Sequence, residues 1–161
     1  MRHDARGFSL IELLIVVAII LIIAAIAIPN LLRSRIAANQ ASAIGSMRII
    51  NTAEVTYSSS FGLGYSTTLA KLGPPAAGVP ADASAAGLLD SVLASGVKSG
   101  YSFSYTPNLA DASGKFKGYT LNGAPTQVGT TGSAYYFTDQ TYVIRGTTTG
   151  PATASDSPVA Q

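Results

Sequence analysis

The sequence has no cysteine, and among its 161 residues the only histidine is His3. The lack of cysteine excludes disulfides and thiolate metal sites. Beyond position 3, the lack of histidine excludes a Ser-His-Asp triad, histidine acid–base catalysis and the usual zinc ligand sets. Only a few scattered carboxylates are left for chemistry. We therefore expect no enzyme, no cofactor and no metal site.

Charged residues are also scarce. They make up 11% of the chain, against about 25% in an ordinary soluble domain. The formal net charge is only +2, and the sequence has no basic run of the kind that follows a phosphate backbone. The composition therefore predicts no nucleic-acid partner.

What the sequence does have is a long apolar run near its N-terminus. Residues 8–28 are almost wholly apolar, and they meet the length of about 20 residues that a membrane-spanning helix needs. Arg2 and Arg6 precede the run and place the N-terminus in the cytoplasm by the positive-inside rule. Arg33 and Arg35 follow the run and compete with that orientation.

The apolar run has three possible interpretations. A cleaved secretory signal has an apolar core of about 7–15 residues before an A-x-A-like site. Ala25-Ile26-Ala27 fits such a site, but the run before it is too long. A plain single-pass anchor explains the length, yet it gives no reason for Gly7-Phe8 or for Glu12, a lone carboxylate at the edge of the run.

The third interpretation rests on a resemblance to a known family. The stretch "RGFSLIELLIVVAIILIIAAIAIPNLL" resembles the N-terminus of type IV pilins and the related pseudopilins. In that family a short basic leader ends in Gly, here Gly7, and Phe8 follows it. A glutamate stands four residues after the Phe, here Glu12, and a proline lies at the foot of the apolar helix, here Pro29. The motif covers roughly a fifth of the chain.

The resemblance implies a maturation and assembly route. A membrane-embedded prepilin peptidase would cut between Gly7 and Phe8 on the cytoplasmic side and methylate the new Phe8 amine. The processed subunit would wait in the bacterial inner membrane until a platform and an ATPase assemble it into an extracellular helical homopolymer. Such filaments serve adhesion, twitching motility or DNA uptake. Phe8, Glu12 and Pro29 would be the assembly residues.

Glu12 has a physical role in this interpretation. A carboxylate inside a bilayer costs a few kcal/mol or more when it has no partner. In a filament core, the Phe8 ammonium of an adjacent subunit can be that partner, and the pair would set the axial register more than it adds stability. The alternative is a carboxylate that reaches the lipid headgroups from its position near the membrane edge.

The rest of the chain predicts an α+β pilin fold, in which the long helix packs against a small antiparallel sheet of about four strands. The helix should run from about Phe8 to about Ser58, and its second half has an apolar stripe at helical spacing. The stripe consists of Ile36, Ala43, Met47, Ile50 and Tyr57. The predicted regions are a leader (1–7), a membrane or filament-core helix (8–29), an amphipathic half-helix (30–58), loops with a short helix (59–99), a sheet (100–146) and a flexible tail (147–161).

Several local patterns support this organisation of the head. Residues 84–95 predict a short helix with Ser84 as its cap and Gly96 as its stop. Apolar and polar residues alternate from Tyr101 to Thr106, which is typical of a half-buried strand. Three further strands are predicted in "KFKGYTLN", "SAYYFTD" and "TYVIRG". The turn between the last two contains Asp139, whose carboxylate is better suited to capping the turn than to binding calcium, because a calcium site needs several oxygen ligands together.

Two other functions share the N-terminal features. One is a type II secretion pseudopilin, which would form a periplasmic pseudopilus. The "DPWG"-like segment and calcium loop usual in major pseudopilins are not visible here, and the chain has no tryptophan. The other is a membrane-anchored binding domain that never polymerises.

Many pilins also close a C-terminal loop with a disulfide, so this cysteine-free head must be held by packing and strand pairing.

Overall fold

A computed structural model describes residues 8–159. The predicted leader, including Gly7, therefore lies outside the described residues. The chain divides into two compact units, one up to Arg35 and one from Ile36 onward, and each is described by itself below. One helix, α1 (Leu10–Phe61), contributes to both units. The predicted long helix is confirmed to within three residues at each end.

In the unit that begins at Ile36, α1 packs through the predicted apolar stripe. Ala43, Met47, Ile50 and Tyr57 are all buried, whereas Ile36 is only half-buried. Their spacing of three and four residues places these side chains on one face of the helix. The helix ends where Gly62 takes a positive φ of 64°, a conformation that glycine adopts without a steric penalty.

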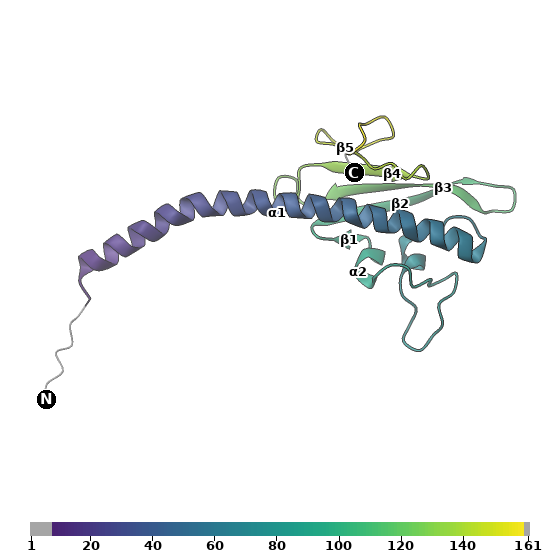
Figure 1. The fold of residues 1–161 in the computed structure, drawn as a ribbon, viewed down its shortest axis with the longest axis horizontal. Coiled ribbons are helices and arrows are strands. Elements are labelled where there is room, and N and C mark those ends of the chain that lie inside the picture. The colour runs from purple at the N-terminus through teal and green to yellow at the C-terminus, as the bar shows by residue number, and fades with distance from the viewer. Residues whose placement is uncertain (1–7, 160–161) are drawn as a thin grey trace. The chain divides into compact units, whose positions relative to one another are not determined.

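The same unit contains a five-stranded antiparallel sheet whose strands follow one another in chain order. The strands are β1 (Val97–Lys98), β2 (Tyr101–Ala110), β3 (Phe116–Pro125), β4 (Tyr135–Asp139) and β5 (Arg145–Thr147). Figure 1 shows the second half of α1 lying along this sheet. The predicted α+β fold is confirmed. The sheet has five strands rather than about four because Val97 and Lys98 pair with the start of β2.

The first predicted strand is confirmed, but it is longer than expected. Tyr101 and Phe103 are buried, whereas Ser104 and Thr106 are exposed, as the alternation predicts. The strand continues to Ala110, which pairs with Phe116 of β3. The strand therefore extends beyond the predicted alternation, because this hairpin pairs almost to its tip.

The turn after β4 confirms the capping role predicted for Asp139. Its Oδ1 accepts hydrogen bonds from the Thr141 amide at 2.9 Å and the Thr141 hydroxyl at 2.6 Å. The Tyr142 amide also donates to the Asp139 carbonyl at 2.9 Å. The strand predicted to begin at Thr141 is displaced as a result. It begins at Arg145, because the chain needs the intervening residues to complete the turn.

The short helix was predicted too long and with the wrong cap. Helix α2 covers only Ser91–Ala94, and the Asp90 side chain caps it by accepting from the Leu93 amide at 2.8 Å. The Ser84 amide and hydroxyl instead donate to Asp82 in a local turn. Residues 86–89 are not helical because their amides bond to the carbonyls of residues 71–73, beside the 3-10 helix η1 (Leu69–Leu72).

The C-terminal segment was predicted to be a flexible tail, and the structure differs from that prediction. In its described part, to residue 159, the chain folds back against β5. The Val159 amide donates to the Ile144 carbonyl at 2.8 Å, and the Arg145 guanidinium donates to the Asp156 carbonyl at 2.9 Å. Ala152 is buried. The composition gave little sign of this because backbone hydrogen bonds and small side chains hold the segment.

Candidate assembly segment

The first turn of α1 is capped by Glu12. The Ser9 amide donates to Glu12 Oε2 at 2.9 Å, and the Leu13 amide donates to the Ser9 carbonyl at 3.2 Å. Ser9 therefore stands at the N-cap and Glu12 three residues later, which is the glutamate half of a capping box. The spacing Ser-x-x-Glu was the sequence signal for this role, which was not predicted. A negative charge is also favourable at a helix N-terminus.

Phe8 and Glu12 lie close together at this end of the helix. Phe8 directly precedes the Ser9 amide that Glu12 caps, and 77% of its surface is exposed. Within the part of the chain that the structure describes, Glu12 Oε1 makes no hydrogen bond. One carboxylate oxygen therefore caps the helix beside Phe8, and the other is left for a further donor.

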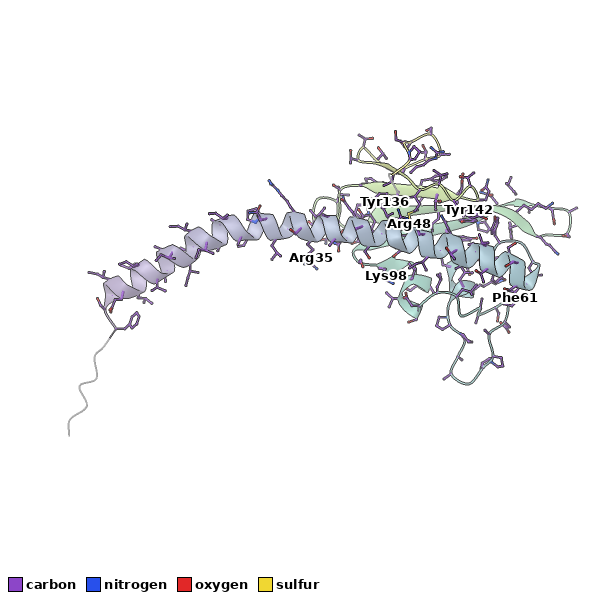
Figure 2. The ribbon with its side chains drawn as sticks, viewed as in Figure 1. Arg35, Arg48, Phe61, Lys98, Tyr136 and Tyr142 are labelled. Atoms are coloured by element: carbon purple, nitrogen blue, oxygen red, sulfur yellow. The ribbon has the colours of Figure 1, made fainter. Side chains whose placement is uncertain are left out.

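Beyond Glu12, the apolar side chains of α1 are exposed, and Figure 2 shows side chains projecting from both sides of this part of the helix. No charged side chain occurs in residues 13–32. The large hydrophobic residues there are all exposed, by between 42% (Leu32) and 71% (Leu31). An 18-residue window of α1 has a mean hydropathy of 3.3, and none of that window is buried, so α1 is long and apolar enough to cross a membrane. Apolar surface this extensive is typical of a membrane or protein contact.

Pro29 lies inside α1 without ending it. Proline has no backbone N–H, so the carbonyl of Ala25 lacks its usual helical donor. One residue further on, the Asn30 side chain donates to the Ile26 carbonyl at 3.0 Å. The helix is therefore continuous, but its backbone hydrogen bonding is interrupted just before the unit boundary after Arg35.

Glu54 is a buried carboxylate that our sequence analysis missed. Its side chain is fully buried and accepts hydrogen bonds from the Ser66 amide at 2.9 Å and the Ser66 hydroxyl at 2.5 Å. Its position four residues after Ile50 and three before Tyr57 was the available signal, because this spacing places it on the apolar stripe. Burial raises the pKa of Glu54 above its ordinary value.

The described residues contain no cluster of three or more His, Cys, Asp or Glu side chains that could hold a metal ion. Two other acids, Asp82 and Asp111, bind the serine two residues later, as Asp139 binds Thr141. These hydrogen bonds lower the pKa of Asp111 to about 2. Asp82, Asp111 and Asp139 thus each stabilise a local turn.

Comparison with known proteins identifies the N-terminal segment. Residues 2–28 match the family described as the prokaryotic N-terminal methylation motif. The N-terminal segment of the chain is therefore similar to that of prokaryotic prepilins. The matched residues include Phe8 and Glu12 and most of the exposed apolar surface of α1.

Two curated relatives carry the same similarity. The type IV wide pilus major component PilA4 of Thermus thermophilus is 67% identical over 37 residues, which are 23% of this chain and 28% of the relative. The type IV major pilin protein PilA of Myxococcus xanthus is 48% identical over 52 residues, 32% of this chain and 24% of the relative. The chain therefore matches about a quarter of each relative's length. Both are pilus proteins rather than enzymes. No solved structure matches the chain.

Proposed function

We propose that this chain is a structural subunit of a type IV pilus. The observation that carries the proposal is the methylation motif placed on a helix whose apolar surface is exposed on all sides. An apolar helix of this kind needs either lipid or other apolar helices around it. A subunit that is first held in a membrane and then packed into a filament core satisfies both needs in turn.

Maturation would begin at the boundary between Gly7 and Phe8. A prepilin peptidase would remove the leader, and methylation would follow on the new Phe8 amine. The exposure of Phe8, at 77%, supports this order, because the bond must be accessible to an enzyme before the helix is packed. Residue 8 would then carry the positive charge that the intact chain lacks at this position.

Assembly would pair that charge with Glu12. In the single subunit, Glu12 Oε2 caps α1 through the Ser9 amide. The free Oε1 would accept the Phe8 ammonium of a neighbouring subunit as the helices pack together. A buried charge without a partner is strongly destabilising. Subunits that dock in the wrong axial register would leave both charges unpaired, so the pair would select the register.

The proposal also names partners and a location. The subunit would be a single-pass precursor in the bacterial inner membrane, and a platform and ATPase would add it to an extracellular filament. The filament would serve adhesion, twitching motility or DNA uptake. The names of both relatives, as pilus components, favour this function over the pseudopilus of type II secretion, which has the same N-terminal features.

The mature protein is expected to begin at Phe8. Intact-mass spectrometry of the protein from its native cell should show the loss of residues 1–7 and the gain of one methyl group on the Phe8 amine. Peptide fragmentation should place the methyl group on residue 8. A mature protein that retains its first seven residues would contradict the entire maturation route.

Imaging is the decisive test of the function itself. Surface filaments sheared from the native cell should contain this chain as a subunit by mass spectrometry, and deletion of its gene should remove the chain from them. A pseudopilin would behave differently, since its loss would block export of secreted proteins and leave surface filaments unchanged. A chain that stays in the membrane fraction under all conditions would contradict both filament functions.

A further inference from the structure

Glu54 is held at the point where the segment after α1 returns to the head. The carboxylate comes from α1, and both of its oxygens accept hydrogen bonds from Ser66. The Tyr105 hydroxyl of β2 donates to the Ser66 carbonyl at 2.9 Å. Ser66 is itself fully buried. This group of contacts ties residues 62–68 to both the helix and the sheet.

The hydrogen-bond geometry leaves one proton too few if Glu54 is ionised. The Ser66 hydroxyl oxygen lies 2.5 Å from Glu54 Oε1 and 3.1 Å from the carbonyl oxygen of Thr68. A serine hydroxyl has one hydrogen, whereas an ionised carboxylate and a carbonyl only accept. A proton on Glu54 Oε1 removes the conflict: Glu54 donates to the Ser66 hydroxyl, which in turn donates to Thr68.

The surroundings of Glu54 supply no compensating positive charge. The ion pairs within residues 8–159 are Lys98–Asp90 and Lys117–Asp111, and neither includes Glu54. The titratable groups whose pKa values the Glu54 charge raises are all tyrosines: Tyr57 of α1, Tyr65, Tyr105 of β2 and Tyr119 of β3. The negative charge of Asp82 also raises the pKa of Tyr57, so this second charge near Glu54 is negative as well. An ionised carboxylate at this position would be buried without a cation, which is costly.

We propose that Glu54 is a buried proton-binding site, and that its protonated form holds residues 62–68 against α1 and β2. Ionisation of Glu54 would leave a buried charge without a cation, and it would loosen this attachment. The effect would extend along the segment, because Leu69 and Leu72, which enter the core, follow directly after Thr68. The head would thus be held together more firmly in acidic surroundings than in alkaline ones.

The sign of the pH dependence follows from the direction of the shift. Burial raises the pKa of Glu54 in the folded head, so folding takes up a proton. The stabilisation is complete below the ordinary glutamate pKa and is lost as the pH rises through the raised value. Asp82, Asp90 and Asp111 have lowered pKa values, so their contributions are lost only as the pH falls below about 4. Burial raises the pKa values of six tyrosines above the ordinary value of about 10: Tyr57, Tyr65, Tyr101, Tyr105, Tyr119 and Tyr136. Between these two pH limits, Glu54 is the group expected to titrate among the described residues whose pKa values are shifted.

Carboxyl NMR on the full-length chain in detergent micelles tests the proton directly. Glu12 and Glu54 are the only glutamates in the sequence, so glutamate labelled with carbon-13 at Cδ gives two signals. The signal that survives in a Glu12→Gln variant belongs to Glu54. That signal is expected to titrate clearly above the ordinary glutamate pKa of about 4.3. Titration at or below the ordinary value would overturn the proposal.

Proteolysis tests the structural consequence. Lys71 is the only lysine or arginine in residues 62–90, so trypsin cleavage after Lys71 reports on this segment. The ratio of the wild-type cleavage rate to the Glu54→Gln cleavage rate should be higher at pH 9 than at pH 6. The wild type loses the proton on Glu54 as the pH rises, whereas the glutamine variant has no proton to lose there. The glutamine provides the hydrogen bonds of a protonated glutamate at every pH.

Asp82→Asn is the matched control. It also removes a carboxylate from residues 62–90, but the pKa of Asp82 is lowered rather than raised. Its cleavage should follow the pH dependence of the wild type. Because each comparison is made at one pH, the pH dependence of trypsin itself cancels. A constant ratio of wild-type to Glu54→Gln cleavage across this range would overturn the proposed attachment, whatever the NMR titration shows.

Discussion

Replacing Glu12 with leucine is expected to abolish surface filaments while leaving the subunit in the membrane. The leucine removes the proposed partner of the Phe8 ammonium, and breaking a buried ion pair in this way costs about 3–5 kcal/mol. At each subunit contact, that cost corresponds to a loss of more than about a hundredfold in association. Electron microscopy of cells and the amount of subunit in sheared filaments measure the result.

Two further variants separate the possible roles of Glu12. Glu12→Gln keeps an oxygen that can cap the Ser9 amide, but it lacks the charge, so it should also fail to assemble. Glu54→Gln is the matched control at the other glutamate, where neutralisation should leave filaments intact. If Glu12→Gln forms filaments in normal amounts, Glu12 acts as a helix cap and the pairing role is wrong.

Truncating Leu121 is expected to cause the largest loss of stability in the head. Leu121 is fully buried in β3, the middle strand of the sheet, and belongs to the main hydrophobic core. Replacing a buried leucine with alanine removes its apolar contacts and leaves a cavity, which costs about 2–5 kcal/mol. Chemical denaturation of the full-length chain in micelles, followed by tyrosine fluorescence, measures the change in the free energy of unfolding.

Leu109→Ala gives a matched control for this substitution. Leu109 lies in β2, and 61% of its surface is exposed. The same chemical change there should alter the free energy of unfolding by less than about 0.5 kcal/mol. Equal losses for the two variants would mean that Leu121 does not lie in the core of the folded head.

Local patterns were enough to predict much of the molecule. Alternation from Tyr101 to Thr106 identified β2, and the three- and four-residue spacing from Ala43 to Tyr57 identified the packed face of α1. The turn at Asp139 was also recognisable, because an aspartate that binds the residue two positions later needs only its neighbours. Each of these features depends on residues close together in the chain.

Other features depended on contacts between distant residues. Residues 84–90 have helical composition, yet the amides of Ala86 and Leu88 bond to the carbonyls of Lys71 and Leu72 instead. The C-terminal segment is polar and rich in small residues, yet Val159 bonds to Ile144 beside β5. In both places, backbone hydrogen bonds that composition cannot reveal compete successfully with the local preference.

The two glutamates show most clearly what the sequence determined and what the tertiary structure decided. The sequence by itself determined that Glu12 stands at the head of an apolar helix, in the spacing of a prepilin motif, because that motif is read along a single stretch of chain. Only the tertiary structure decided that Glu54 is buried, outside the ion pairs of the described residues and hydrogen-bonded to Ser66. Its surroundings are assembled from α1, β2 and the segment after Gly62, and a carboxylate's charge state depends on all of the groups that fold around it.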